Sequence, residues 1–264
     1  MIVPMDNDKK QDAEKNLQKL CSKSLEVCNE LLHKDVKKVV LLGITGGVAA
    51  GKSTLGRYVQ QFLIENLPKY RTVMISTDSF IFSNAYLQSK SLLQRKGFPE
   101  SFAWQDLKKF IEQIKGRRHS KYKIPLYFHE KKDIVAGCLN IIEQADIYIV
   151  EGINLLFNYI DKDNVFCLRD YLDFSIYLNT NVTIAKQRAV HRFHLACQQT
   201  QNQSIPYFDS LKALSSSQLT QYIENLWENI NTSILNNYIA PHRDDVDMVV
   251  NDLPELYNGD PYPQ

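Results

Sequence analysis

Residues 39–54 read Val-Val-Leu-Leu-Gly-Ile-Thr-Gly-Gly-Val-Ala-Ala-Gly-Lys-Ser-Thr, and this stretch decides the fold. An apolar run leads into the pattern Gly46-x-x-x-x-Gly51-Lys52-Ser53, and a helical pattern follows it. A strand before such a glycine-rich loop and a helix after it are the context in which the pattern binds nucleotide phosphates. A chance glycine-rich turn is the weaker interpretation, so the sequence predicts a phosphate-binding loop.

The residue types in this loop suit a nucleoside triphosphate. Glycines let backbone N–H groups curl around phosphate oxygens, and the following helix adds the positive end of its dipole. Lys52 can reach the outer phosphates, and the Ser53 hydroxyl can hold Mg²⁺. We therefore expect the triphosphate to be bound by Gly46, Gly47, Val48, Ala49, Ala50, Gly51, Lys52, Ser53 and Thr54.

Length and composition are those of an ordinary globular protein. The chain has 264 residues, of which 44% are hydrophobic and 23% are charged. Because it shows no internal repeat and no convincing linker, we expect one domain covering residues 1–264. The formal net charge of +1 argues against a dedicated nucleic-acid-binding protein, since such proteins usually carry a strongly basic face.

The sequence predicts a cytoplasmic protein that does not enter a membrane. The longest apolar stretch, near residues 39–50, is too short to span a bilayer, and the polar N-terminal residues form no signal-peptide core. Five cysteines are scattered without a CxxC pair, which indicates reduced thiols rather than a disulfide framework. Cys21 and Cys28 share the apolar face of an expected helix, so we assign them to core packing.

Hydrophobic periodicity outlines the expected elements along the chain. Apolar residues at helical spacing predict helices over 12–33, 52–65, 85–95, 105–114, 182–197 and 217–238. Short apolar runs predict strands over 38–45, 72–76, 122–126, 133–141, 146–151, 174–178 and 246–250. Four segments are expected to be irregular: a disordered or loose start at 1–11, a long connection at 153–170, a mobile loop at 198–207 and a tail at 251–264. Strands that alternate with helices give an α/β fold with a mainly parallel sheet flanked by helices.

Carboxylates follow two of the predicted strands. In an open α/β sheet, ligands bind beyond the carboxyl ends of the strands. The strand at 72–76 delivers Asp78 to this edge, and the strand at 146–151 ends in Glu151. Two carboxylates beside a triphosphate suit phosphoryl transfer, because one can hold Mg²⁺ and the other can accept a hydroxyl proton. Taken singly, Asp78 could instead cap a helix and Glu151 could be a surface charge.

Other nucleotide-dependent classes fit less well. The apolar run before Glu151 ends in Glu rather than Asp, which weakens an assignment to the motor or AAA-type ATPases. No Asn-Lys-x-Asp sequence for guanine recognition is present, which argues against a GTPase. The sequence thus favours a small-molecule phosphotransferase.

The expected helix at 182–197 carries several basic residues. Arg188 and Arg192 are four residues apart and share one face, where a guanidinium could neutralise charge on a transferring phosphoryl group. The alternative is an ordinary solvated basic face. His191, His194 and Cys197 are spaced like metal ligands, but no partner cluster accompanies them, so we do not expect metal binding there. Between the expected strands at 122–126 and 133–141, His129 could bind a polar substrate or could be a surface histidine.

Several motifs together resemble bacterial type I pantothenate kinases, a family in the P-loop kinase group that also contains uridine kinase and phosphoribulokinase. The resemblance runs from about residue 39 to residue 250, roughly four-fifths of the chain. Its most specific part is the run Lys-Gly-Phe-Pro-Glu-Ser at 96–101, which is far more distinctive than a phosphate loop. The other matching segments are 77–85, 125–129, 151–154, 173–177 and 239–243.

The resemblance implies a P-loop kinase-like three-layer sandwich and an enzyme that moves the γ-phosphate of ATP to the primary hydroxyl of pantothenate, the first step of coenzyme A synthesis. It implies that Lys52 and Ser53 serve ATP and Mg²⁺, that Glu151 works beside the metal, and that Asp78 contacts the reacting hydroxyl. The implied catalytic set is Lys52, Asp78, Glu151 and Arg192, and the implied pantothenate set is Asp78, Tyr127, His129, Arg192 and Asn231. Arg57 matches a position linked to feedback by coenzyme A, and the family is typically dimeric.

The chain departs from the family pattern on the acceptor side. Lys132 stands where the family has a tyrosine three residues after the pocket histidine, and Ala189 stands where it has a tyrosine three residues before the pocket arginine. The segment before the loop is shorter than usual, and the family's histidine beside the adenine has no evident counterpart after Val250.

Three functions stay open at the level of sequence. The first is an ATP-dependent pantothenate kinase. The second is a kinase of the same group that phosphorylates another hydroxylated acceptor, such as glycerate or a nucleoside, because Lys132 suits a more anionic substrate. The third is a non-catalytic nucleotide-binding protein, although such a protein would not need an acceptor-side carboxylate at Asp78.

Overall fold

The computed structural model describes residues 7–35, 37–161, 164–199 and 206–251. A five-stranded sheet lies at its centre, with the strands in the order β2-β5-β1-β8-β9 and every neighbouring pair parallel. These strands are β1 (Val40–Gly46), β2 (Thr72–Ser76), β5 (Ile147–Glu151), β8 (Phe174–Asn179) and β9 (Met248–Asn251). All residues of β1 and β5 are buried, as expected for a parallel sheet that is covered on both faces.

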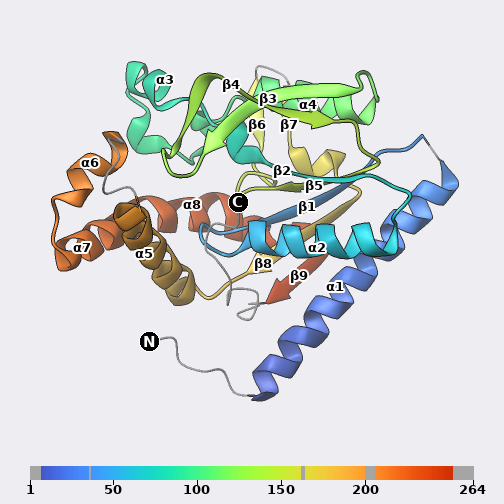
Figure 1. Ribbon diagram of the computed structural model, residues 1–264, viewed down its shortest axis with the longest axis horizontal. Helices are drawn as coiled ribbons and strands as arrows, with labels where there is room; N and C mark the ends of the chain where they lie inside the picture. Colours follow the sequence, from blue (N-terminus) through green and yellow to red (C-terminus); the bar gives the residue numbers. More distant parts are fainter. Residues whose placement is uncertain (1–6, 36, 162–163, 200–205, 252–264) are drawn as a thin grey trace.

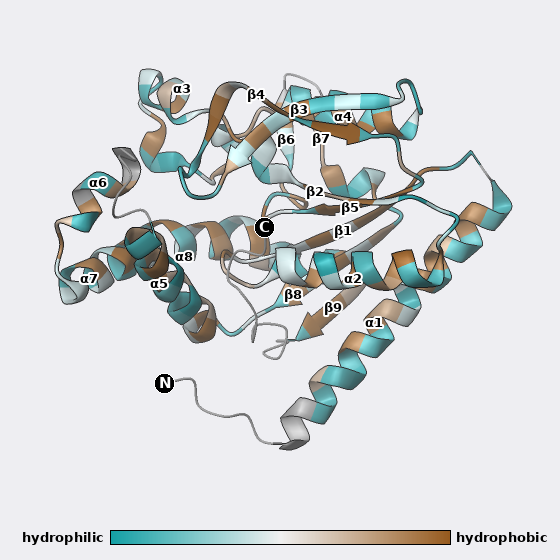
Figure 2. Ribbon diagram, in the orientation of Figure 1, coloured by the Kyte–Doolittle hydropathy of each residue, from teal (hydrophilic) through white to brown (hydrophobic). Residues whose placement is uncertain are grey.

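Helices cover the two faces of this sheet and form a three-layer sandwich (Figure 1). On one face, α1 (Asn7–Lys34) and α2 (Lys52–Asn66) pack against alternate strand residues such as Leu42 and Ile149. On the other face, α4 (Trp104–Lys115) packs against the intervening residues, such as Leu41 and Tyr148. Figure 2 shows the apolar strands enclosed between helices whose outer sides are hydrophilic. The predicted fold class is therefore confirmed.

Further hairpins and helices lie outside the central sheet. An antiparallel hairpin is formed by β3 (Lys121–Phe128) and β4 (Asp133–Glu143), with α3 (Asn84–Ser89) beside its turn (Figure 1). A smaller hairpin consists of β6 (Tyr159–Asp161) and β7 (Asn164–Phe166). The remaining helices are α5 (Val182–Gln199), α6 (Pro206–Lys212), α7 (Ser216–Leu226) and the short α8 (Thr232–Ile234).

Several expected elements need correction. Residues 7–11 belong to α1 and are not loose, because α1 begins at Asn7 and covers the predicted 12–33. The helix expected at 85–95 ends at Ser89, since Ser91 adopts a left-handed φ of 57°, and only a 3₁₀ turn follows at Leu93–Arg95. The connection at 153–170 contains β6 and β7, and the ends of the expected loop at 198–207 belong to α5 and α6. Of the expected tail, residues 252–264 lie outside the described residues.

The long helix expected at 217–238 is present but not regular. After α7 the backbone forms a π-helical turn at Trp227–Asn231, the short α8 and a second π-helical turn at Leu235–Ile239. Turns of this kind are uncommon and occur often at functional sites. The first of these π-helical turns ends at Asn231, which the resemblance assigned to the pantothenate site.

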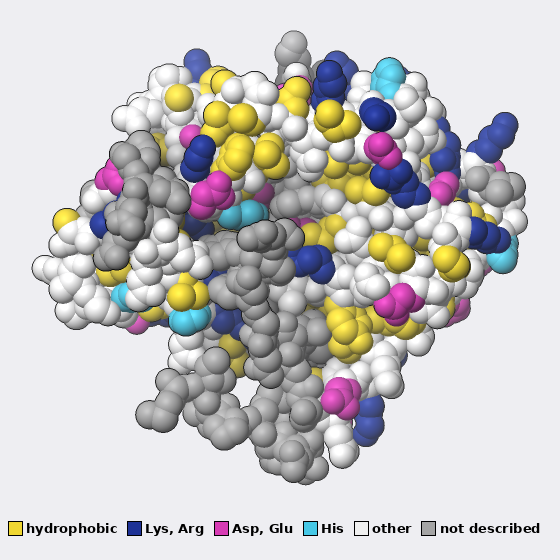
Figure 3. Space-filling view, viewed as in Figure 1, with side chains coloured by type: hydrophobic (Ala, Val, Ile, Leu, Met, Phe, Trp, Pro, Cys, Tyr) yellow, Lys and Arg dark blue, Asp and Glu magenta, His cyan; other side chains and the backbone are white. Residues whose placement is uncertain are grey.

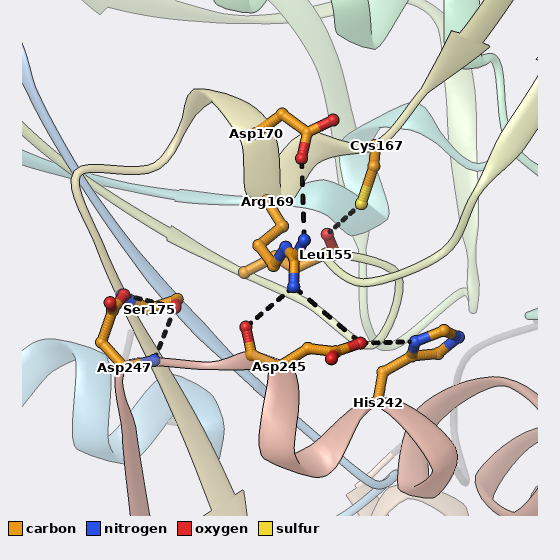
Figure 4. Close-up of polar contacts among 8 residues, drawn as sticks. All are labelled: Leu155, Cys167, Arg169, Asp170, Ser175, His242, Asp245 and Asp247. Atoms are coloured by element: carbon orange, nitrogen blue, oxygen red, sulfur yellow. Dashed lines mark hydrogen bonds and ion pairs between the residues drawn. The ribbon is translucent and has the colours of Figure 1, made fainter.

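Side-chain contacts attach the C-terminal strand to its neighbour (Figure 4). The Asp247 carboxylate accepts hydrogen bonds from the Ser175 backbone N–H (2.7 Å) and hydroxyl (2.6 Å) just before β9 begins. Arg169 donates to the Asp245 carbonyl at 3.0 Å, and His242 contacts the Asp245 carboxylate at 2.9 Å. These bonds fix the segment that returns from the second π-helical turn to β9.

All five cysteines are free thiols, and Cys21 and Cys28 are buried against the sheet as predicted. On the face seen in Figure 3, basic and acidic side chains are interspersed, in keeping with the net charge of +1. Within the described ranges, no helix combines the length and the apolar character needed to cross a bilayer.

Candidate active site

The predicted phosphate loop joins β1 to α2 in a conformation that its glycines permit. Gly46 has φ of 145° and Gly51 has φ of 105°, values that residues with a Cβ rarely adopt. A Cβ on Gly46 would also lie only 2.5 Å from the Leu178 carbonyl oxygen of β8. The chain can therefore turn tightly at the end of β1 and enter α2 at Lys52 with its first N–H groups facing the loop.

Three side chains donate hydrogen bonds to backbone carbonyls of the loop. Lys52 Nζ donates to the Gly47 carbonyl at 2.9 Å. Thr180 Oγ1 and Arg188 Nη1 both donate to the Ala50 carbonyl, at 3.0 Å and 3.2 Å. Arg188 thus contacts the loop backbone, so the interpretation of this residue as part of a solvated basic face is wrong. Because these loop carbonyls point towards side-chain donors, N–H groups of the loop remain available to bind an anion.

Glu151 lies at the carboxyl edge of the sheet, between β2 and β1. It is in register with Ile44 of β1 on one side and Ser76 of β2 on the other. Ser53 Oγ donates to Glu151 Oε1 at 3.1 Å, and the glutamate is only 5% exposed. The alternative of a surface charge is therefore wrong, and a hydroxyl and a carboxylate converge where the loop enters α2.

Burial governs the protonation of the groups at this point. Desolvation raises the pKa of Glu151 above its ordinary value, while Lys52 and hydrogen bonds from Ser76 and Ser53 oppose the rise. Desolvation likewise lowers the pKa of Lys52, and the charges of Glu151 and Asp78 oppose that change. The opposite charges of Lys52 and Glu151 thus each oppose the effect of burial on the other group.

Asp78 enters the site from the neighbouring strand. It lies in a 3₁₀ turn (Thr77–Phe80) that directly follows β2, and the cap of this turn is the Ser76 side chain, which accepts from the Asp78 N–H at 3.3 Å. The interpretation of Asp78 as the capping residue is therefore wrong. A buried hydrogen bond from Thr77 Oγ1 to Asn154 Oδ1 (2.6 Å) ties the same turn to the chain beyond β5. This leaves the Asp78 carboxylate half-buried beside Lys52.

The β3–β4 hairpin brings further polar groups towards Asp78. The rings of Tyr127 and His129 meet edge to face with their centroids 5.2 Å apart. Partial desolvation lowers the pKa of His129; the charge of Asp78 opposes this shift, and those of Lys132 and Arg192 reinforce it. The charge of Arg192 on α5 also acts on Lys52, so this arginine is near both the hairpin and the phosphate loop.

Asn231 lies on another side of the loop. It lines a pocket of about 310 Å³ together with the loop residues Gly47, Val48 and Ala50, the end of β8 and the helical segment up to Arg243. The structure thus groups Lys52, Ser53, Asp78, Glu151, His129 and Arg192 around one point, with Tyr127 beside His129. It places Asn231 next to the loop but on its β8 side.

Arg57, which was selected only by the resemblance, lies half-buried in α2. Among the described residues, His191, His194 and Cys197 form no metal-binding group. Lys96 was given no role of its own from the sequence. Lys96 Nζ donates to Asn84 Oδ1 at 2.6 Å and to the Lys132 carbonyl, and lies 5.5 Å from the Tyr127 ring centroid. Its position at the start of the distinctive run 96–101 was the available signal. His194 instead contacts Thr220 Oγ1 at 2.9 Å, and within the described ranges no cluster of three potential metal ligands occurs.

Comparison with known proteins places the chain in a family. Residues 41–195, more than half of the chain, match the phosphoribulokinase / uridine kinase family. A pantothenate kinase of Streptococcus thermophilus is 35% identical over 220 residues, covering 83% of this chain and 69% of the relative. Another from Ligilactobacillus salivarius is 33% identical over 223 residues, covering 84% and 72%.

Solved structures agree on the fold. A protein described as a fructose transport system kinase from Silicibacter sp. TM1040 superposes with a TM-score of 0.65 at 21% identity, covering 89% of this chain and 98% of that one. D-glycerate 3-kinase from Cryptococcus neoformans superposes with a TM-score of 0.54 at 12% identity, covering 88% and 95%. At these identities the likeness shows the architecture of a P-loop kinase and nothing finer.

The phosphate loop, the strand-end carboxylates and the sequence relatives point in one direction. The chain is an ATP-using kinase that belongs to the phosphoribulokinase / uridine kinase family and, within it, to the pantothenate kinases.

Proposed function

We propose that this protein transfers the γ-phosphate of ATP to the primary hydroxyl of pantothenate in the cytoplasm, as the first step of coenzyme A synthesis. The observation that carries the proposal is the convergence of Lys52, Glu151 and Asp78 at the ends of three adjacent strands. The pantothenate kinases that are 33–35% identical to the chain support the choice of acceptor.

The loop and Lys52 would bind the triphosphate. Backbone N–H groups between Gly46 and Thr54 would surround the phosphate oxygens, and the α2 N-terminus would add its dipole. Lys52 would exchange its bond to the Gly47 carbonyl for a phosphate oxygen. Its charge would then stabilise negative charge that develops on the transferring group.

Ser53 and Glu151 have the donor chemistry that Mg²⁺ prefers. Mg²⁺ binds oxygen ligands, usually through one or two protein groups together with phosphates and water. The Ser53 hydroxyl and the Glu151 carboxylate are such oxygen donors, 3.1 Å apart, and both face the loop. When bound, Mg²⁺ would neutralise charge between the outer phosphates. The proposed metal ligands are therefore Ser53 and Glu151.

Asp78 would act on the acceptor. Its carboxylate would accept a hydrogen bond from the primary hydroxyl and take its proton as the new O–P bond forms and the bond from the γ-phosphorus to the ADP oxygen breaks. Tyr127 and His129 on the hairpin, with Arg192 on α5, would hold the remainder of the acceptor. Asn231 would contact the substrates from the pocket on the β8 side.

Two further properties follow from family membership as proposals. Arg57 lies half-buried in α2, one turn beyond the loop, where it could take part in feedback inhibition by coenzyme A. The protein would also form a homodimer, as expected for the family. Sedimentation and inhibition by coenzyme A in wild type and Arg57→Ala test these two points.

One experiment separates the candidate functions. Purified protein, ATP and Mg²⁺ are offered pantothenate, D-glycerate and uridine in turn while ADP release is followed. Pantothenate-dependent turnover that disappears in Asp78→Ala supports the proposal. Turnover with only one of the other acceptors overturns the choice of substrate, and ATP binding without turnover on any acceptor indicates a non-catalytic protein.

A further inference from the structure

Lys96 anchors the turn of the β3–β4 hairpin, which lies beside the proposed acceptor site; we call this contact the Lys96 clamp. Lys132 closes this turn with a left-handed φ of 51°. Its carbonyl accepts hydrogen bonds from Lys96 Nζ and from Asn84 Nδ2 (3.4 Å), and the Asp133 carboxylate accepts from the Asn84 N–H (2.8 Å). The main chain at Lys132 is therefore fixed against α3.

The side chain of Lys132 points from this anchored turn to α5. Its Nζ lies 4.9 Å from the centroid of the Phe193 ring, in the geometry of a cation–π contact. Phe193 directly follows Arg192 in α5. The ammonium group is thus placed between the hairpin that carries His129 and the helix that carries Arg192.

Charge around this ammonium group is unbalanced. Among the described residues, the charged groups that act on it are Arg192, Asp78 and Lys96, so two cations and one carboxylate shift its pKa; it also acts on His129. Burial lowers the pKa of Lys132 to about 8, the charges of Arg192 and Lys96 add to this effect, and Asp78 opposes it. Excess positive charge in a partly desolvated place favours a bound anion.

The site proposed for ATP contains a different lysine, Lys52. The groups that act on Lys52 are Glu151, Asp78 and Arg192, whereas those that act on Lys132 are Arg192, Asp78 and Lys96. Lys52 lies in the phosphate loop, where it donates to the Gly47 carbonyl, whereas Lys132 lies on the hairpin turn against Phe193 of α5. An anion at Lys132 therefore belongs to the acceptor and not to ATP.

We propose that Lys132 is a specificity-determining residue of the acceptor site, and that its ammonium group binds the carboxylate of the acceptor. The inference rests on the proposed function, because it assumes that the acceptor hydroxyl meets Asp78. Pantothenate carries a carboxylate at the end opposite its primary hydroxyl. A charged site of this kind rejects a neutral isostere, since the amide would leave the partly buried ammonium group without its counter-charge.

The test compares pantothenate with its primary amide as acceptors. Initial rates are measured for wild type, Lys132→Met and the control Lys131→Met, whose exposed ammonium group lies over Phe128 instead. We expect Lys132→Met to raise KM for pantothenate by about 10-fold or more and to leave KM for the amide within about 2-fold. Lys131→Met should change neither value by more than about 2-fold.

Two further measurements test the assignment of Lys132 even if Lys132→Met folds poorly. Lys132→Arg keeps the charge and should preserve the preference for the carboxylate. In wild type, KM for pantothenate should rise as pH increases through about 8, where Lys132 loses its proton, and KM for the amide should not follow it.

The outcomes are distinguishable. If Lys132→Met raises KM equally for both acceptors, or leaves the preference unchanged, the assignment of Lys132 is wrong while the proposed function stands. If wild type phosphorylates neither acceptor, the proposed function is wrong and the inference falls with it.

Discussion

The Ser53 hydroxyl donates a hydrogen bond to Glu151 Oε1 at 3.1 Å, joining the start of α2 to the end of β5. These residues are 98 positions apart in the sequence. Parallel pairing of β1 with β5 brings them together, because Glu151 is in register with Ile44 just before the loop. The metal site of the proposal depends on this contact.

Glu151→Gln tests that contact. The amide keeps the shape of the side chain but removes the negative charge, so we expect kcat to fall by about 10²-fold and the Mg²⁺ concentration for half-maximal rate to rise. Steady-state rates over a Mg²⁺ titration measure both effects. An unchanged Mg²⁺ dependence would remove Glu151 from the metal site.

Lys52→Ala tests the phosphate loop. Removing the ammonium group should cost several kcal/mol of transition-state stabilisation, a loss of about 10²-fold or more in kcat. Circular dichroism establishes that the variant is folded before its rate is compared with wild type. A kcat close to that of wild type would contradict the assignment.

Arg188→Met tests the support of the loop by α5. Because Arg188 donates to the Ala50 carbonyl, its loss should loosen the loop and raise KM for ATP by about 5- to 10-fold, the effect of one charge-assisted hydrogen bond. Lys186→Met is the matched control, since Lys186 lies on the same helix but pairs with Glu224 and Glu228 at the surface. Equal values of KM for the two variants would show that Arg188 does not position the loop.

Ser175→Ala tests how β9 is held to β8. The substitution removes the hydroxyl that donates to Asp247 and accepts from its N–H, so the free energy of unfolding should fall by about 1–3 kcal/mol. Urea unfolding measures this change. Asn179→Ala, which removes the exposed contact to Asn251 in the same strand pair, should cost less than about 0.5 kcal/mol. A smaller loss for Ser175→Ala than for Asn179→Ala would contradict the account.

Much of the architecture could be predicted from the sequence, because its signals are local. The strand at 72–76 was predicted with its observed bounds, since a short apolar run ends there at a polar turn. The break after Ser89 could not be predicted, because it depends on a left-handed Ser91 in an otherwise helical stretch. Likewise, β6 and β7 are too short to show a periodic pattern.

In the candidate site, too, some residues could be predicted from the sequence and others could not. Strand-end carboxylates could be predicted from the rule that parallel strands deliver ligands at one edge, which is how Asp78 and Glu151 were selected. The role of Arg188 on the loop and the clamp formed by Lys96 could not, because both depend on contacts between segments far apart in the sequence. The charge excess around Lys132 likewise emerges only once the hairpin lies against α5.

Transfer of label from [γ-³²P]ATP to pantothenate tests the central claim most directly. With wild type, the label should appear in phosphorylated pantothenate. In Asp78→Asn, the transfer rate should fall by about 10²-fold or more while ATP binding is retained. Absence of label in pantothenate with wild type, or undiminished transfer by Asp78→Asn, would contradict the account.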